Sequence, residues 1–326
     1  MTHQIHRRRA CAIITLAAFA GLGSPVQAQD YPSRPIRVIV PFPPGGGGDV
    51  LMRPFGRKLS EVLGQQVIVD NRAGANGNIG ATAVAKSAPD GYTLLLGNSS
   101  LPISATLYDK LAYDPTKDLT MIGLVSNTPS VLVVHPSVPA RNMAELIALA
   151  KSQPGKLNFG SAGSGSTPHL SVEQLKTMAG LDMVHVPYNG SGPAVAAVLA
   201  GDVQVLVTNV GPLLSQIRAG KVRPLGVTSA QRVAVLPDVP TIGETVKGYQ
   251  SRTWYALMGP ANLPPSVVTK LNSALAETLS APDVRKQLQD MGYEPESNSP
   301  QAMSALFRND ISMWGKVIKA SGAKVE

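Results

Sequence analysis

The sequence predicts an α/β protein of two lobes, each a mainly parallel sheet flanked by helices, with a ligand cleft between the lobes. Two observations support this fold class. Short runs of Val, Ile and Leu alternate with helical spacings along the chain, which is typical of strands buried on both faces and joined by helices. The alternation also occurs twice, in stretches of different sequence. With 326 residues, 44% of them hydrophobic, the chain is long enough to bury two cores.

The first group of elements lies between residues 36 and 96. After its first apolar run, Leu51, Phe55, Leu59, Val62 and Leu63 recur at helical spacing. The expected elements are strands at 36–40, 67–70 and 92–96, and helices at 51–63 and 81–86.

The second group follows the same pattern with its own residues. Its expected strands are 131–134, 157–159, 182–186 and 203–207, and its expected helices are 143–150, 170–178, 194–200 and 213–219. A strand at 254–258 and three helices, at 266–280, 282–291 and 300–319, complete the chain. We therefore expect residues 29–127 plus 230–326 to form the first lobe and 128–229 the second, with the two crossings as a hinge.

The first 28 residues have the composition of a secretory signal peptide. A basic stretch, Arg7–Arg9, precedes an apolar run at 10–23 that is too short to span a bilayer, and Val26-Gln27-Ala28 resembles a cleavage site. A buried first helix is the alternative. We expect cleavage after Ala28 and a periplasmic location. The one cysteine, Cys11, then lies in the removed segment, so the mature chain has no disulfide and no thiolate.

Charge argues against binding to nucleic acid. Removal of three arginines lowers the formal net charge from +8 to +5, and the mature chain has no run of five like charges. After residue 28, no stretch of about 18 apolar residues follows, so we expect no membrane-embedded segment. Transport across a membrane would then require separate transporter subunits as partners. We expect the protein itself to be a monomer.

The most informative segment is PFPPGGGGD at residues 41–49, between a strand and a helix. Its glycines permit positive φ and let backbone N–H groups approach a ligand, and a helix N-terminus attracts anions. The predicted ligand-binding residues are Phe42, Gly45, Gly46, Gly47, Gly48 and Asp49. The alternatives are a flexible linker or a phosphate site, but no lysine lies in the loop as a P-loop would require.

A second segment, GSAGSGSTPH at 160–169, also connects a strand to a helix. Its hydroxyls could cap the helix, with Ser166 or Thr167 as N-cap and Pro168 at the first position, and could also bind a carboxylate. Ser161, Ser164, Ser166 and Thr167 are therefore predicted ligand-binding residues. Three residues at predicted strand ends are added as pocket or turn residues: Asn98, Tyr188 and Asn209.

The sequence contains few features of a catalytic, metal or cofactor site. Ser166 and His169 could form part of a hydrolase site, but no G-x-S-x-G motif is present. The glycines at 74, 77 and 80 follow a strand but depart from the dinucleotide-binding spacing. His135, His169 and His185 lack metal-ligand spacing. We expect no enzymatic activity, no cofactor and no metal.

These segments together resemble the Bug family, the extracytoplasmic receptors of tripartite tricarboxylate transporters. The resemblance rests on YPSRPI at 31–36, PFPPGGGGD at 41–49, VDNRAGA at 69–75, PDGYTL at 89–94, residues 160–170, VPY at 186–188, LPDVPT at 236–241 and Trp254. It implies a periplasmic-binding-protein-like fold that closes on a small organic acid, aliphatic or aromatic, without catalysis. It also implies that Phe42 and residues 45–49 form one jaw, and the residues around Ser161–Thr167 the other.

The sequence departs from the family pattern where Thr208 and Asn209 stand, because many members have an acid nearby. Without that acid a ligand ammonium would lack a counter-charge, which favours a plain carboxylate or dicarboxylate. A receptor that signals ligand occupancy to a sensor domain is an alternative that the sequence leaves open.

Overall fold

The computed structural model describes residues 31–324; the predicted signal peptide lies outside the described residues. One compact unit begins at Arg34 and holds two sheets. We call the sheet of β1, β2, β3, β4, β10 and β11 with its helices the first lobe, and the sheet of β5–β9 with its helices the second lobe. No helix within residues 31–324 is long and apolar enough to cross a membrane.

The first lobe is built on a sheet with the strand order β11-β4-β10-β3-β1-β2. Its strands are β1 (Ile36–Val40), β2 (Val67–Asn71), β3 (Thr93–Asn98), β4 (Leu119–Thr128), β10 (Thr253–Pro260) and β11 (Glu294–Pro295). β1 pairs in parallel with β2 and β3, whereas β10 runs antiparallel to both β3 and β4. Four strands of this sheet therefore point one way, and β10 is inserted among them in the opposite direction.

The second lobe repeats this arrangement, with the order β7-β6-β8-β5-β9. Its strands are β5 (Ser130–Val134), β6 (Asn158–Ser161), β7 (Val184–Pro187), β8 (Val205–Asn209) and β9 (Arg223–Val227). Here β5 is the inserted strand, antiparallel to β8 and β9. Each inserted strand comes directly after the chain has crossed from the other lobe, which explains its reversed direction.

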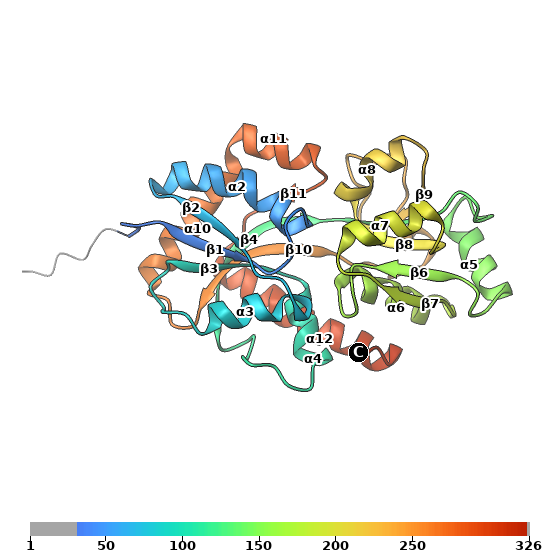
Figure 1. Cartoon of the computed structure of the whole chain (residues 1–326), viewed down its shortest axis with the longest axis horizontal. Helices are drawn as coiled ribbons and strands as arrows, with labels where there is room; N and C mark the ends of the chain where they lie inside the picture. The colour runs from blue at the N-terminus through green and yellow to red at the C-terminus, as the bar shows by residue number, and fades with distance from the viewer. Residues whose placement is uncertain (1–30, 325–326) are drawn as a thin grey trace, which may run out of the picture. The chain divides into compact units, whose positions relative to one another are not determined.

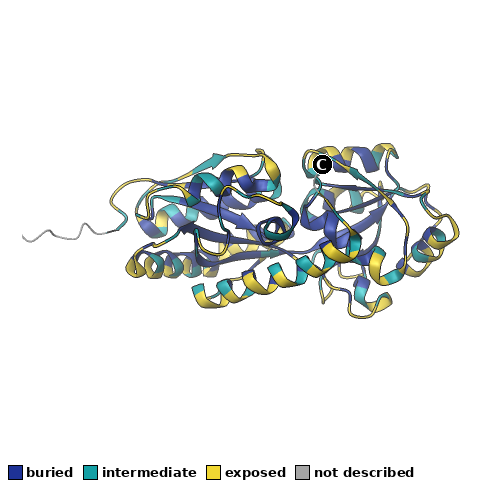
Figure 2. Ribbon diagram, turned by 90° about the horizontal axis from the view of Figure 1, so that it is seen from below, coloured by how far each residue is buried: buried dark blue, intermediate teal, exposed yellow. Residues whose placement is uncertain are grey.

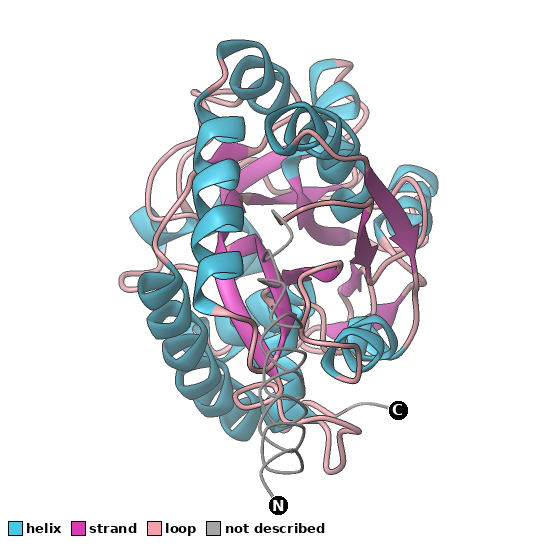
Figure 3. Ribbon diagram, turned by 90° about the vertical axis from the view of Figure 1, so that its left-hand side faces the viewer, coloured by secondary structure: helices cyan, strands magenta, loops and turns pink. Residues whose placement is uncertain are grey.

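Helices cover both faces of each sheet (Figures 1 and 3). The first lobe contains α2 (Gly47–Leu63), η1 (Ala75–Gly77), α3 (Asn78–Ala85), α4 (Ser100–Leu107), α10 (Pro265–Ser280), α11 (Pro282–Asp290) and α12 (Pro300–Ser321). The second lobe and its exit contain α5 (Met143–Ser152), α6 (Thr167–Ala179), α7 (Ser191–Ala200), α8 (Val210–Arg218) and α9 (Ile242–Thr245).

Strand side chains alternate between two apolar cores in the second lobe. Leu132 and Val134 of β5 pack toward α5 and α6, whereas Val131 and Val133 pack toward α7 and α8. Figure 2 shows most of the strands in dark blue and the outward faces of the helices in yellow, and the edge strands β2 and β7 are less buried than the rest. This burial on both faces is the reason that the strands appear in the sequence as continuous apolar runs.

The C-terminal helix α12 joins the two lobes. Its first half packs on the first sheet through Met303 and Phe307. Its second half contributes Trp314 and Ile318 to an apolar cluster that also contains Leu170 of α6 and Leu107 of α4. α12 therefore contacts both lobes, packing against α4 and β4 of the first and α6 of the second (Figure 1).

The predicted two-lobed α/β fold is confirmed, with differences in detail. β4, α4, β9 and α9 were not predicted from the sequence, nor were the short elements η1 and β11. Several helices also begin three or four residues earlier than expected: α2 at Gly47, α6 at Thr167, α7 at Ser191 and α8 at Val210.

Candidate functional site

The first glycine-rich loop leads directly into α2, as predicted, but its glycines serve different purposes. Gly45 alone among the four has a positive φ, +77°. Gly46 is extended, with φ −70° and ψ 165°, and Gly47 and Gly48 already belong to α2. A Cβ on Gly47 would lie 2.7 Å from the Tyr255 hydroxyl and 3.2 Å from Asn209 Nδ2. Close approach of neighbouring side chains, rather than positive φ, therefore requires glycine at 47.

Asp49 stabilises this loop from behind. Its Oδ2 accepts hydrogen bonds from the Gly45 N–H at 2.9 Å and from Arg53 Nε at 2.9 Å, and its Oδ1 accepts one from Arg53 Nη2 at 3.0 Å. Burial alone would raise the pKa of the Asp49 carboxyl, but these donors outweigh it and the pKa is lowered. The buried carboxylate is therefore ionised and engaged with its own loop.

The second loop builds the start of α6. Ser166 is the N-cap, and its Oγ accepts a hydrogen bond from the His169 N–H at 3.3 Å. The adjacent Thr167 Oγ1 lies 2.7 Å from Ser99 Oγ of the first lobe, and both residues are buried. The predicted capping role of Ser166 agrees with this geometry.

A cavity of about 80 Å³ lies between these two loops. It is lined from the first lobe by Phe42, Pro43, Gly46, Gly47, Gly48, Asn98, Ser100, Thr253 and Tyr255. The second lobe contributes Ala162, Ser166, Thr167, Pro168, Gly190, Ser191, Thr208 and Asn209.

Within residues 31–324, five helices begin at this cavity: α2, α4, α6, α7 and α8. The first backbone N–H groups of each helix have no carbonyl partner within the helix, and they carry the positive end of its dipole. None of the lining residues has an ionised side chain, since all are Gly, Ala, Pro, Ser, Thr, Asn, Phe or Tyr. The cavity is thus electrically positive through backbone dipoles, and it contains no acid.

Two tyrosines lie near the start of α2: Tyr255 lines the cavity, and Tyr293 lies outside its lining. The Tyr293 hydroxyl donates to the Gly47 carbonyl at 2.7 Å. Burial raises the pKa of Tyr255 to about 12, although a hydrogen bond with Asn209 lowers it in part, and burial also raises the pKa of Tyr293. Both phenols are therefore protonated at neutral pH and can act as hydrogen-bond donors.

Eight of the thirteen predicted ligand-binding residues line the cavity: Phe42, Gly46, Gly47, Gly48, Asn98, Ser166, Thr167 and Asn209. The other five, Gly45, Asp49, Ser161, Ser164 and Tyr188, do not. The Asp49 carboxylate is turned back to Gly45 and Arg53, while Tyr188 packs against the second core. Sequence reasoning missed Tyr255 and Ser100. Tyr255 lies near the amino end of β10, which runs antiparallel to β3 and β4, and Ser100 begins α4, a helix that was not predicted.

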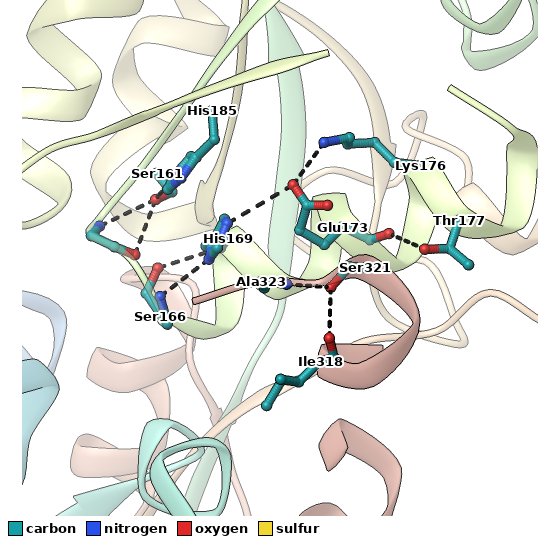
Figure 4. Close-up of polar contacts among 12 residues, drawn as sticks. Ser161, Ser166, His169, Glu173, Lys176, Thr177, His185, Ile318, Ser321 and Ala323 are labelled. Atoms are coloured by element: carbon teal, nitrogen blue, oxygen red, sulfur yellow. Dashed lines mark hydrogen bonds and ion pairs between the residues drawn. The ribbon is translucent and has the colours of Figure 1, made fainter. Parts of the chain in front are cut away.

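Ser161 belongs instead to a buried cluster behind the second loop (Figure 4). Its Oγ lies 2.7 Å from His185 Nε2, and the rings of His185 and His169 stack with centroids 3.8 Å apart. Glu173 Oε1 lies 3.9 Å from His169 Nε2 and 2.9 Å from Lys176 Nζ. Burial is the main cause that lowers the pKa of His169 to about 3 and of His185 to about 4, so both imidazoles are neutral at pH 7.

The cluster does not form a nucleophile–base pair with Ser166. His169 Nδ1 accepts the Gly165 N–H at 3.1 Å, and the Ser166 hydroxyl interacts with the His169 backbone. This arrangement builds a helix cap rather than activating a hydroxyl. Among residues 31–324, no group of three or more His, Cys, Asp or Glu could hold a metal ion.

Known proteins share this fold and sequence. Residues 51–323 match the family described as "Tripartite tricarboxylate transporter family receptor". Protein BugT of Bordetella pertussis is 40% identical over 316 residues, which covers 95% of this chain and 96% of BugT.

Solved structures agree with this assignment. The R. palustris protein Rpa4515 with adipate is 37% identical with a TM-score of 0.86, and the match covers 91% of this chain and 100% of that one. The periplasmic binding protein BugD is 32% identical with a TM-score of 0.83, and the coverages are 91% and 100%. MatC from Rhodopseudomonas palustris, with bound malate, is 33% identical with a TM-score of 0.81, and the coverages are 88% and 100%. The chain therefore belongs to the tripartite tricarboxylate transporter receptor family, a family of periplasmic solute-binding receptors rather than enzymes.

Proposed function

We propose that this protein captures a small organic dicarboxylate in the cavity between its lobes and delivers it to the membrane subunits of a tripartite tricarboxylate transporter. The observation that carries the proposal is the convergence of five helix N-termini on a cavity without ionised side chains. Helix dipoles and the N–H groups of a helix's first turn stabilise anions. Two of these N–H groups already have partners, since Ser100 N–H donates to Asn98 Oδ1 at 3.2 Å and Val210 N–H donates to the Pro129 carbonyl at 3.1 Å.

The same geometry disfavours a cationic or zwitterionic ligand. An ammonium group would need an acid nearby to offset its loss of hydration, and the lining residues contain no Asp or Glu. Asp49 cannot serve, because its oxygens are engaged by Gly45 and Arg53. A carboxylate, in contrast, can accept hydrogen bonds from backbone N–H groups on either side.

Two carboxylates fit better than one because donors come from both lobes. α2 and α4 begin at the cavity in the first lobe, and α6, α7 and α8 begin there in the second. A ligand with an acid group at each end would bridge the lobes and favour their closure. The adipate and malate complexes of the related R. palustris proteins support a dicarboxylate.

The proposed binding residues form two jaws. Phe42 and Gly46–Gly48 make the first, with Gly45 and Asp49 supporting it, and Ser166 and Thr167 make the second. Ser161 acts behind the second jaw through its contact with His185. Ser164 and Tyr188 do not line the cavity, and we propose only that they shape the segments beside it.

The proposal also includes export, oligomeric state and lobe boundaries. We expect cleavage after Ala28, which N-terminal sequencing of the periplasmic protein would reveal as a chain starting at Gln29. We expect a monomer, which sedimentation would show. We propose lobe boundaries near residues 127 and 229. The chain passes from β4 to β5 beside the first of these, whereas Val233, Leu236 and Val239, beyond the second, still pack in a core of the second lobe.

A thermal-shift screen followed by calorimetry tests the ligand class. The panel contains adipate, malate, hexanoate and 1,6-diaminohexane, all at matched ionic strength. We expect adipate or malate to raise the melting temperature, because a ligand at 100 times its Kd stabilises the folded state by about 2.7 kcal/mol. Hexanoate, which has one carboxylate, should raise the melting temperature less. The proposal would be contradicted if only the diamine raised the melting temperature, or if neither adipate nor malate did.

A further inference from the structure

A hydrogen bond outside the cavity joins the two lobes. It runs from Asn76 Nδ2, in the short helix η1 between β2 and α3 of the first lobe, to the carbonyl oxygen of Gly165 in the second, at 2.8 Å. Neither Asn76 nor Gly165 lines the cavity. The contact therefore joins the lobes at a place where the ligand would not touch it.

The backbone of the first-lobe loop holds Asn76 in an unusual conformation. Ala75 and Asn76 have φ values of +46° and +53°, so two successive residues other than glycine lie in the left-handed region. Such residues are uncommon and concentrate at functional sites, although asparagine tolerates this region better than most. The conformation is maintained by the interactions of the loop.

Asn78 fixes the loop to its own lobe. Its Nδ2 donates to the Ala75 carbonyl at 2.8 Å and to Ser104 Oγ of α4 at 3.0 Å. Its Oδ1 accepts from the Tyr113 hydroxyl at 3.0 Å. Asn78 is itself buried, so these bonds anchor the turn that carries Asn76.

The acceptor on the second lobe is equally well held. Gly165 has a φ of +78°, and its N–H donates to the buried His169 Nδ1 at 3.1 Å. Both polar backbone groups of Gly165 are therefore engaged, one within its lobe and one across the cleft. The next two residues, Ser166 and Thr167, line the cavity (Figure 4 shows Ser166 beside His169).

We infer that Asn76 is a latch: a positioning residue that holds the second jaw closed and slows ligand release without contacting the ligand. When the lobes separate, the Asn76 amide and the Gly165 carbonyl must part, so the bond stabilises only the closed state. The inference rests on the proposed function where ligand release is measured, but it also predicts a change in lobe closure that needs no ligand.

Asn76→Gly is the principal test. Glycine keeps the positive φ at no steric cost and removes only the side-chain donor. We expect adipate to dissociate about 3- to 10-fold faster by stopped flow, because one hydrogen bond between the lobes is lost. The association rate and the melting temperature should change little. Asn76→Asp should accelerate release more, because a carboxylate of the same size cannot donate and would face the Gly165 carbonyl.

The matched control is Asn262→Gly. Asn262 also has a positive φ, +62°, but is exposed in the turn after β10. It should leave adipate release unchanged. Equal release rates for wild type and Asn76→Gly would overturn the inference, as would an equal acceleration in Asn262→Gly.

A second measurement applies even if adipate does not bind. Spin labels at Arg57→Cys in α2 and Lys151→Cys in α5, in a Cys11→Ser background, report the distance between the lobes. Without ligand, we expect Asn76→Gly to lose part of the short-distance population that wild type shows. Identical distance distributions would overturn the latch, whereas failure of every dicarboxylate to bind would overturn the proposed function alone.

Discussion

The hydroxyl oxygens of Ser99 and Thr167 lie 2.7 Å apart in a buried contact between the two lobes, at the edge of the cavity. Ser99 is the N-cap residue of α4, and Thr167 is the first residue of α6. The contact thus aligns two of the helix N-termini that we propose bind the ligand. It forms only while the lobes are together.

Thr167→Val should weaken binding of the tightest dicarboxylate. The change preserves shape but leaves the Ser99 hydroxyl without this partner, which costs about 1–3 kcal/mol in the closed state, or a factor of about 5 to 160 in affinity. Calorimetry measures the effect. Thr177→Val is the control, because that hydroxyl lies on the same helix but is exposed and bonds only the Glu173 carbonyl at 2.9 Å. Equal affinities for the two variants would refute the role of Thr167.

Gly47→Ala should abolish most binding without unfolding the protein. The new methyl group would lie 2.7 Å from the Tyr255 hydroxyl, so the first jaw or Tyr255 must shift. We expect affinity to fall at least tenfold, with the circular dichroism spectrum unchanged. Gly192→Ala in α7 is the matched control, since no atom lies within 4 Å of its Cβ position. Normal binding by a folded Gly47→Ala protein would show that the first jaw is misplaced.

The two-lobed fold could be predicted because most of the central strands are buried on both faces, although the edge strands β2 and β7 are more exposed. Residues 36–40 and the C-terminal helices were placed almost to the residue. The starts of the helices at the cavity were placed too late for one physical reason. The first turn of α2 and of α7 is rich in Gly, Ser or Pro and faces the cavity or its loops, so it lacks the apolar spacing that marks a helix in the sequence. In α8, Val210 packs in the core, but Gly211 and Pro212 follow it.

The lack of apolar spacing at helix starts also explains why some residues that line the cavity were not predicted. Ser191 and Gly190 lie in a first turn that the apolar pattern of α7 did not include. Ser100 lies in α4, whose residues are so uniformly buried that no amphipathic period exists. Contacts between distant segments, such as that of Asn76 with Gly165, depend on how the lobes meet, and no local pattern encodes them.

Arg53→Met should weaken carboxylate binding in a salt-dependent way. The Asp49 carboxylate is buried beside the first jaw, and Arg53 is its ion-pair partner at 2.9 Å. Without the guanidinium, a less compensated negative charge would stand near a bound anion. Because Arg53 is largely exposed and screened by solvent, we expect only about a two- to fivefold loss of affinity at low salt. Arg57→Met, on the exposed face of the same helix, should have a smaller effect. A loss that does not shrink at high salt would rule out the electrostatic explanation.

The stacked histidines should make stability depend on pH. Burial lowers the pKa of His169 to about 3, with smaller contributions from His185 and Lys176, and lowers that of His185 to about 4. In the unfolded chain, histidine is protonated below about pH 6.5. Between pH 6.5 and about 4 the unfolded state therefore binds more protons, so the free energy of unfolding should fall as pH falls, by on the order of 1 kcal/mol per pH unit.

Urea unfolding between pH 4.5 and 7 measures this slope. The double variant His169→Gln/His185→Gln keeps acceptors at both sites but cannot titrate, so its slope should be shallower than that of wild type even if its stability is lower throughout. The slope for each single variant should lie between those of wild type and the double variant. Parallel slopes for wild type and the double variant would exclude the histidines as the cause.

A bulky side chain at position 230, in a groove lined by the two segments that connect the lobes, should strengthen dicarboxylate binding. Tyr255 of β10 faces the ligand cavity, whereas its neighbour Trp254 points away and donates from Nε1 to Asp310 Oδ2 at 2.6 Å. Asp310 lines a second cavity, of about 620 Å³, together with both segments that cross between the lobes, and the two cavities share no lining residue.

Closing the lobes on one face of β10 should widen the groove on the other, and opening them should narrow it. Ala230→Trp places an indole in that groove, where it would resist opening and shift the equilibrium toward the closed state. We expect dicarboxylate affinity to rise about 3- to 10-fold through slower dissociation, a change of roughly 1 kcal/mol. Ala230→Ser, which adds no bulk, should bind like wild type. If Ala230→Trp binds no more tightly than Ala230→Ser, the groove does not change with closure and the hinge lies elsewhere.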